Sequence, residues 1–181
     1  MSIHRPIVIP KDLWLLIFLA LNKYSPVEDY ARIHLIFFLY DLLGFEFDYG
    51  PMGPYSREVE NALIALQQRG FIKVIKQGTK RIYRLTDSGA REAYKVIYKI
   101  KNSYILLNNV LIVKGENVLR DLKKFKLSYG EKPLLYLLSK CLDRMKGGKP
   151  VNLKQNTTPL MNIFLTELSL ELERLLKNKK L

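Results

Sequence analysis

Between residues 56 and 69 the chain carries side chains suited to reading nucleic-acid bases. Four of them follow one another in steps of four, three and four residues and so share one face of a helix: Arg57, Asn61, Ile64 and Gln68. Arg has bidentate geometry for guanine, and Asn and Gln have it for adenine. The pattern predicts a helix that presents this face to a DNA groove, with Ser56 as its cap and a further contact. The alternative is a solvated face, because Glu58 and Glu60 in the first turn suit the helix dipole but repel phosphates.

The next fifteen residues carry a cluster of basic side chains. No acidic residue occurs between positions 71 and 86, and the predicted phosphate-binding residues of this segment are Lys73, Lys76, Gln77, Lys80, Arg81 and Arg84. Contacts from such a cluster to the DNA backbone give affinity that does not depend on sequence and falls steeply with salt. The alternative is an exposed hairpin whose lysines only prevent aggregation.

Other arrangements of reactive side chains predict no catalytic, metal or cofactor site. The two histidines, His4 and His34, have no cysteine or acidic residue at metal-ligand spacing. Asp41, Glu46 and Asp48 form the densest acidic group, but their spacing matches no two-metal nuclease. The chain has neither a glycine-rich phosphate loop nor a nucleophile elbow. We therefore expect that the protein is not an enzyme.

The net charge of +13 favours an anionic partner. Residues 71–104 carry nine basic and two acidic side chains, and residues 105–150 carry ten and four, so the charge lies in the middle of the chain. Lysine-rich solvated surfaces of thermophile proteins are the alternative explanation. A single cysteine, Cys141, excludes an intrachain disulfide and favours a cytoplasmic location. The apolar runs 13–21 and 33–43 are too short to span a bilayer, so we expect no membrane association.

The first half of the chain is predicted to form, in order, a helix, a helix, a loop, a helix, a hairpin and a helix. The predicted helices cover residues 11–23, 26–43, 56–69 and 87–101, the last with Ala90, Ala93, Tyr94, Ile97 and Tyr98 as its apolar residues. Residues 45–54 are expected to form a loop, and residues 71–76 and 80–85 two strands joined by a tight turn. A hairpin directly after the third helix is the wing of a winged helix-turn-helix.

Beyond residue 103 we expect a helical extension. The apolar segment 104–114, an amphipathic helix at 116–126 with lysines on its outer side and a helix at 133–145 precede a linker at 147–157. A last helix at 158–177 has apolar residues at coiled-coil spacing, and these are the predicted dimerisation residues: Met161, Leu165, Leu168, Leu172 and Leu175. Packing of this helix on its own domain is the alternative to a homodimer.

Three short stretches resemble the YwgA-like winged-helix proteins, a prokaryotic and partly phage-associated family. Residues 45–59, FEFDYGPMGPYSREV, are similar to the aromatic "YGPYSxEL" loop of that family. Residues 66–72 match its "LxxxGLI" pattern, and residues 83–89 match its "YxLTxxG" exit from the wing. The chain departs from the family at Ile33-His34, where members carry Gln-Lys, and by the additional residues 51–53. The resemblance covers roughly residues 26–100 and implies the winged-helix fold.

Together these observations predict a mainly α protein with a small β-hairpin: a winged helix-turn-helix at 1–103 and a helical extension at 104–181. The expected function is that of a dimeric transcriptional regulator that binds double-stranded DNA mainly through its backbone. The competing expectation is a protein-interaction module, antitoxin-like, phage-associated or part of a replication complex. In that module the winged helix is a scaffold and the basic surface docks an acidic protein.

Overall fold

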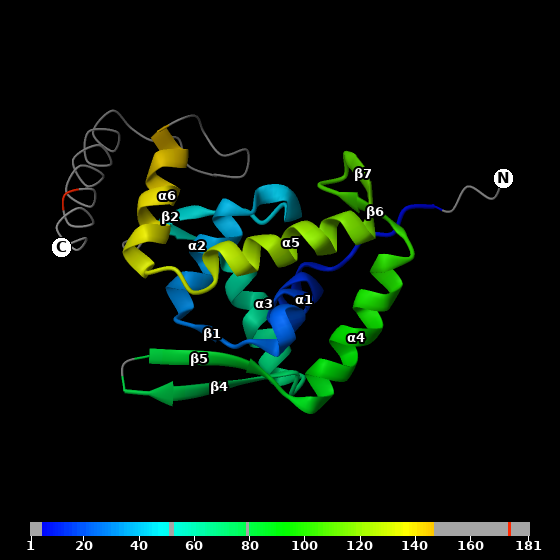
Figure 1. Cartoon of the computed structure of the whole chain (residues 1–181), viewed down its shortest axis with the longest axis horizontal. Helices are drawn as coiled ribbons and strands as arrows, with labels where there is room; N and C mark the ends of the chain where they lie inside the picture. The colour runs from blue at the N-terminus through cyan, green and yellow to red at the C-terminus, as the bar shows by residue number, and fades with distance from the viewer. Residues whose placement is uncertain (1–4, 51–52, 79, 147–173, 175–181) are drawn as a thin grey trace.

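The protein is mainly helical, with three small antiparallel sheets (Figure 1). This computed structural model describes residues 5–50, 53–78, 80–146 and 174. The helices are α1 (Lys11–Tyr24), α2 (Tyr30–Leu39), the 3-10 turn η1 (Asp41–Leu43), α3 (Arg57–Gln68), α4 (Asp87–Lys101), α5 (Gly115–Tyr129) and α6 (Leu134–Lys146). The strands are β1 (Val27–Glu28), β2 (Asp48–Gly50), β3 (Gly53–Tyr55), β4 (Ile72–Gln77), β5 (Lys80–Leu85), β6 (Tyr104–Leu107) and β7 (Leu111–Lys114). The predicted mainly α class with a small β component is confirmed.

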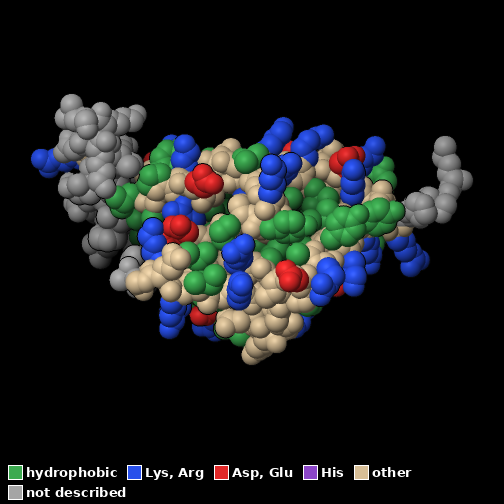
Figure 2. All heavy atoms as spheres, turned by 60° about the horizontal axis from the view of Figure 1, so that its bottom comes forward, with side chains coloured by type: hydrophobic (Ala, Val, Ile, Leu, Met, Phe, Trp, Pro, Cys, Tyr) green, Lys and Arg blue, Asp and Glu red, His purple; other side chains and the backbone are tan. Residues whose placement is uncertain are grey.

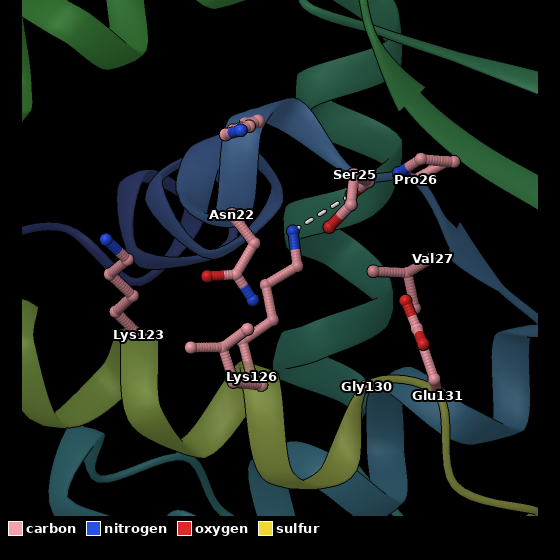
Figure 3. Close-up of a pocket in the computed structure, with 10 residues that line it drawn as sticks. Asn22, Ser25, Pro26, Val27, Lys123, Lys126, Gly130 and Glu131 are labelled. Atoms are coloured by element: carbon pink, nitrogen blue, oxygen red, sulfur yellow. Dashed lines mark hydrogen bonds between the residues drawn. The ribbon is translucent and has the colours of Figure 1, made fainter.

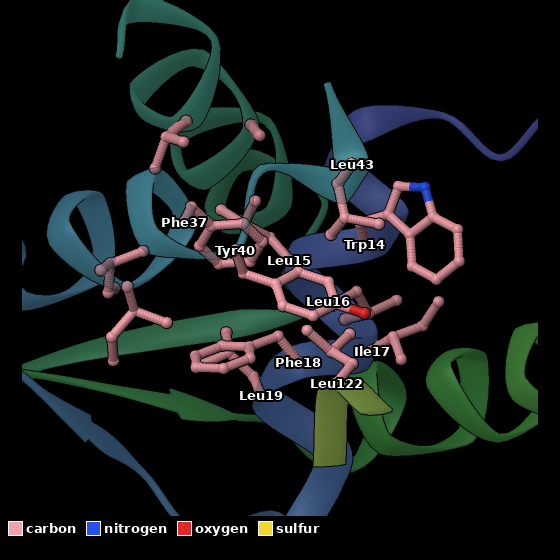
Figure 4. Close-up of a cluster of buried hydrophobic side chains, with 14 of the residues drawn as sticks. Trp14, Leu15, Leu16, Ile17, Phe18, Leu19, Phe37, Tyr40, Leu43 and Leu122 are labelled. Carbon is pink, nitrogen blue, oxygen red and sulfur yellow. The ribbon is translucent and has the colours of Figure 1, made fainter. Parts of the chain in front are cut away.

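Helix α1 forms the centre of the core. Its apolar residues occupy every side of the helix, so it is stable only when other elements surround it. Leu16 and Ile17 are fully buried, and α3, α4 and α5 all pack against this helix. Phe18 meets Phe37 of α2 edge to face at 5.1 Å, and Leu122 of α5 closes the same cluster (Figure 4). The helices that carry the candidate site are therefore fixed on a common apolar support.

The connection between α1 and α2 differs from the sequence prediction. A helix beginning at Pro26 was expected, but Val27–Glu28 forms strand β1 and α2 begins only at Tyr30. The strand pairs with β5, with Val27 opposite Tyr83, and gives a sheet of order β1-β5-β4. Two residues carry no periodicity, so only this pairing reveals the strand. At its other end α2 stops at Leu39, before the 3-10 turn Asp41–Leu43.

The elements around the hairpin follow the prediction closely. Ser56 Oγ accepts a hydrogen bond from Val59 N at 3.3 Å and caps α3, and Thr86 Oγ1 accepts one from Gly89 N at 3.1 Å and caps α4. Thr86 Oγ1 also donates to the Gly70 carbonyl at 2.6 Å. The residues that end α3 are thereby joined to the start of α4, and the base of the β4–β5 hairpin is held between them.

Two further segments are hairpins where the sequence predicted a loop and a buried helical segment. In the aromatic loop, β2 pairs with β3. In residues 104–114, β6 pairs with β7 around a turn in which Asn108 and Asn109 have φ values of 51° and 57°. Asn is among the residues that most readily adopt this left-handed conformation, and Val110 N closes the turn with a hydrogen bond to the Leu107 carbonyl at 3.1 Å. Gly115 begins α5 and does not interrupt a helix.

The predicted helices at 116–126 and 133–145 are confirmed as α5 and α6. Leu122, Leu137 and Cys141 are fully buried in the core that α1 and α2 also share. The lysine-rich outer side expected for α5 is wrong at one position, because Lys126 is buried. The predicted linker at 147–157 and helix at 158–177 lie outside the described residues, and so do its dimerisation residues Met161, Leu165, Leu168, Leu172 and Leu175; of this region only Arg174 is described, and it is helical.

Candidate nucleic-acid interface

Helix α3 presents the face that the sequence predicts. Val59, Ala62, Leu63 and Leu66 are buried, and the exposed positions include Arg57, Asn61, Ile64 and Gln68. Ser56 lies below this face: it is fully buried, and its side chain serves as the N-cap of the helix. The contact predicted for Ser56 is therefore wrong, because its side chain is buried in the cap, while Arg57, Asn61 and Gln68 are exposed.

The two acidic residues in the first turn of α3 both have partners. Lys11 Nζ lies 2.7 and 2.6 Å from the two carboxylate oxygens of Glu58, which also accepts a hydrogen bond from Glu46 N at 2.8 Å. Glu60 accepts a hydrogen bond from the Tyr55 hydroxyl. The charge of Glu58 is thus compensated by α1, and the repulsion of phosphates expected from this turn is weakened.

A buried histidine fixes the start of α3. His34 Nδ1 accepts a hydrogen bond from Ser56 N at 3.0 Å, and its ring stacks on Tyr55 with centroids 5.0 Å apart. Burial lowers the pKa of His34 to about 4, so the ring is neutral at physiological pH and can accept this bond. His34 therefore has a structural role, which is to position the helix that carries Arg57 and Asn61, and its buried Nε2 atom has no hydrogen-bond partner among the described residues.

The basic residues of the β4–β5 hairpin divide between its two faces. Lys73 is paired with Arg84 and Lys76 with Arg81, and because side chains alternate along a strand these two pairs point in opposite directions. Lys76 and Arg81 lie on the face turned toward α3. Lys73, Arg84 and the pair Gln77–Lys80 lie on the other. All six side chains are exposed.

A groove of about 470 Å³ separates the hairpin from α3. The α3 wall carries Glu60, Ile64 and Gln67, the hairpin wall carries Lys76 and Arg81, and Tyr30 of α2 also lines the groove. The two cations of the hairpin wall suit a phosphate backbone that passes beside α3. Glu60 is the only acidic residue among those that line the groove.

Not every cation near this surface is available to a ligand. Lys80 Nζ pairs with Glu28 at 3.1 Å, and Arg69 pairs with Asp12 at 3.0 Å and covers the ring of Phe71. Within the described part of the chain Lys73, Lys76 and Arg84 form no ion pair. These three residues and Arg81 are exposed cations of the hairpin that form no ion pair with a described residue.

Helix α4 carries a second basic surface that the sequence reading missed. Arg91, Lys95 and Lys99 are exposed and lie four residues apart, a spacing that predicts one shared helix face. Beside them Tyr94 and Tyr98 are each 66% exposed, although they were expected among the apolar residues of this helix. The buried side of α4 is formed by Gly89, Ala93, Val96 and Ile100. On the side of the molecule seen in Figure 2, Lys and Arg side chains surround hydrophobic ones, with few acidic residues between them.

Among the described residues no group of three histidine, cysteine, aspartate or glutamate side chains could hold a metal ion. In the same part of the chain no helix is both long and apolar enough to cross a membrane. Comparison with known proteins gives no match to a protein-family model, a curated protein or a solved structure.

Proposed function

We propose that this chain is a winged helix-turn-helix protein that binds double-stranded DNA, with most of its affinity from phosphate contacts. The order α1, β1, α2, α3, β4, β5, with η1 and the β2–β3 hairpin inserted between α2 and α3, supports the fold. In this order β1 lies between the first two helices and pairs with the second strand of the β4–β5 hairpin. The third helix of such a domain enters the major groove. The resemblance of residues 26–100 to the YwgA-like family points the same way.

One observation carries the function: exposed cations without ion-pair partners stand on the hairpin directly beside the exposed polar face of α3. Lys76 and Arg81 face α3 across the groove, and Lys73 and Arg84 face outward. A backbone strand in the groove would meet the first pair, and Arg57, Asn61 and Gln68 would reach the base edges. Only three polar residues are placed to contact bases. We therefore expect the difference in affinity between DNA sequences to be small compared with the part of the affinity that comes from phosphate contacts and depends on salt.

The test is binding of duplex DNA to the whole chain over a series of salt concentrations. The double variant Lys76→Ala, Arg81→Ala should bind every duplex more weakly, and the slope of log affinity against log salt should become shallower by roughly two. The matched control is Lys140→Ala, Lys146→Ala, which removes the same charge from α6 and should leave the slope unchanged. Absence of salt-dependent binding in the wild type, or equal effects of both variants, would refute the proposal.

A regulatory role and a homodimer belong to the same proposal and rest on the sequence. The coiled-coil spacing from Met161 to Leu175 would join two copies, and two-fold symmetry would then match a palindromic site. Leu168→Glu should convert a dimer into a monomer in sedimentation experiments. A wild-type monomer would remove the dimer from the proposal and leave DNA binding to be tested separately.

The second candidate is a protein-interaction module, and Ile64 favours it. This side chain is 48% exposed in the middle of the α3 face, where an apolar contact with a partner protein would bury it. On DNA the same side chain would contact a thymine methyl group. Ile64→Ala therefore distinguishes the candidates: it should change duplex affinity only for thymine-containing sites if α3 reads DNA.

A further inference from the structure

A second cavity, of about 400 Å³, lies away from α3 at the junction of α1, β1 and α5 (Figure 3). Its volume falls within the ~300–1,000 Å³ typical of small-molecule sites. Asn22 points from the end of α1 toward α5, while Lys123 and Lys126 point from α5 toward α1. Pro26 and Val27 of the α1–β1 segment form another wall. Three elements thus enclose one space, and none of the residues proposed for DNA binding lines it.

The lining of this cavity is positively charged. Lys23 and Lys123 are exposed, Lys126 is buried, and Glu131 is the only acidic lining residue. The Lys126 ammonium donates to the carbonyl oxygens of Leu19, Leu21 and Ser25 at 3.2, 2.8 and 2.9 Å. Its three protons are therefore used, and it holds the walls together. Lys23 and Lys123 form no ion pair with any described residue and remain able to bind an anion.

The backbone at the cavity is unusual. Asn22, Lys23 and Tyr24 have φ values of 58°, 56° and 60°, a left-handed conformation that is uncommon for residues other than glycine. Three such residues in succession cost several kcal/mol together, on the order of 1–3 each, and segments of this kind concentrate at ligand-binding sites. The turn directs Asn22 into the cavity.

The Asn22 side chain has an unsatisfied hydrogen-bond acceptor. Its Oδ1 atom is buried and has no hydrogen-bond partner among the described residues. A buried acceptor without a donor destabilises the fold, so a ligand N–H group at this point would gain affinity. A carboxamide presents one acceptor and one donor side by side, the arrangement that pairs with the amino and ring-nitrogen edge of a nucleobase.

We propose that this cavity binds a nucleoside monophosphate, with its phosphate at Lys23 and Lys123, its base edge at Asn22 and its flat rings against Pro26 and Leu127. The two lysines favour an anion, the carboxamide favours a ligand with an N–H donor, and the apolar wall favours a body larger than phosphate. Leu127 is 65% exposed in the free protein, and a bound base would cover it.

Strand β1 connects the cavity to the hairpin. Val27 lines the cavity and is paired with Tyr83 of β5, and the next residue, Glu28, is paired with Ile82 and forms the ion pair with Lys80. A ligand that moves β1 therefore moves the hairpin strand to which it is hydrogen-bonded. We therefore expect the ligand to regulate the hairpin. This regulatory effect rests on the proposed DNA binding, but the existence of the nucleotide site does not.

Isothermal titration of the full chain tests the site, with adenosine monophosphate and guanosine monophosphate as ligands and inorganic phosphate and adenosine as partial ligands. We expect one nucleotide to bind at 1:1 with a Kd of about 1 mM or tighter, and each partial ligand to bind at least about tenfold more weakly. No nucleotide binding, or phosphate binding as tight as that of the nucleotide, would overturn the proposal.

Two variants locate the binding. Asn22→Gly keeps the left-handed turn and removes the carboxamide, so it should weaken nucleotide binding about tenfold or more while it raises the melting temperature of the free protein. Lys123→Gln should also weaken binding, and Lys124→Gln on the neighbouring exposed position is the matched control. Unchanged affinity in Asn22→Gly and Lys123→Gln would show that the nucleotide binds elsewhere and would overturn the site.

A final measurement separates this inference from the proposed function. Duplex DNA affinity is measured with and without saturating nucleotide, and we expect a change of about fivefold or more. If the nucleotide binds but DNA affinity does not change, the connection through β1 is refuted and the site stands. If the chain binds no DNA at all, the proposed function is refuted. The calorimetric result then still shows whether the cavity binds a nucleotide.

Discussion

At the scale of single residues, Lys126 shows how a buried charge shapes this protein. Helix α1 ends in a left-handed turn, which leaves the carbonyl groups of its last turn without helical partners. The Lys126 ammonium from α5 donates hydrogen bonds to these carbonyl groups. Its Nζ atom also lies 5.3 Å from the centre of the Phe18 ring. A residue that sequence reading assigns to a solvated face is therefore a cap for another helix.

The pKa of Lys126 predicts how stability depends on pH. Burial lowers this pKa to about 7 from 10.5, so between these values the unfolded chain binds the additional proton. The free energy of unfolding should therefore rise with pH above 7, by at most about 1.4 kcal/mol per unit, and should be insensitive to this group below 7. Urea unfolding between pH 7 and 9 measures the effect. The Cys141 thiol, whose pKa burial raises, lowers stability toward pH 9 in wild type and Lys126 variants alike, and the buried tyrosines Tyr30 and Tyr40, whose pKa values burial also raises, act only at higher pH.

The control for this prediction is Lys126→Met, which keeps an unbranched side chain of similar length and removes the titrating amino group. At pH 9 the native amine is neutral and has two N–H donors for these carbonyl groups, and Met has none, so we expect a loss of about 1–3 kcal/mol at this pH. The variant should also lack the rise between pH 7 and 9. An identical rise in wild type and variant would assign the dependence to another group.

At the scale of elements, the sequence predicts best where periodicity and capping agree. Helices α3 and α4 have apolar residues at helical spacing and side-chain caps at Ser56 and Thr86, and their positions are correct within a residue or two. Strands β4 and β5 are found through the turn signal between them. The α3 face and the basic hairpin, the two halves of the candidate site, follow directly from these elements.

The elements that escape prediction depend on partners far away in the chain. Strand β1 has two residues and exists because β5 supplies its hydrogen bonds. The β6–β7 hairpin depends on left-handed backbone at Asn108 and Asn109 and on a bridge from Ile7 to Ile105. The cavity at Asn22 arises from the same kind of local departure from helical geometry. No pattern in a single segment encodes such arrangements, so this part of the site could not be predicted.

At the junction of α3, β4 and α4, the close packing leaves no room for a side chain at Gly89, and this can be tested. A methyl group at this position would lie 1.9 Å from the carbonyl oxygen of Phe71, a backbone atom that cannot turn aside. Gly89→Ala should therefore displace α4 from the base of the hairpin and cost about 3 kcal/mol in unfolding experiments. Gly70→Ala is the matched control: it has φ of +68° and open space around it, so only the left-handed conformation, about 1 kcal/mol, is penalised. Equal losses in both variants would contradict the close contact.

At the scale of the whole molecule, the basic residues behind the net charge of +13 have more than one role, and some of them stabilise the fold. Arg32 is buried and donates to the carbonyl oxygens of Glu28, Gly130 and Lys132, and Arg144 donates to that of Leu39 and pairs with Asp41. With Lys126, these cations join α5 and α6 to α1, β1 and α2. Only part of the positive charge is therefore free for a ligand, and it lies on the hairpin, on α4 and at the cavity beside Asn22.

These internal cations and the shared core predict that α1 and α6 unfold together. Trp14 is the only tryptophan and lies buried in α1, and Cys141 is the only cysteine and lies buried in α6, so each reports on one region. Tryptophan fluorescence and pulsed thiol labelling along a urea series should give the same midpoint, because the two side chains belong to one apolar cluster. Labelling of Cys141 at lower urea than the fluorescence change would show instead that the extension beyond residue 103 is a domain of its own. Arg32→Met is the informative variant, since loss of three carbonyl contacts should lower both midpoints by the same amount if α6 is part of the same cooperative unit.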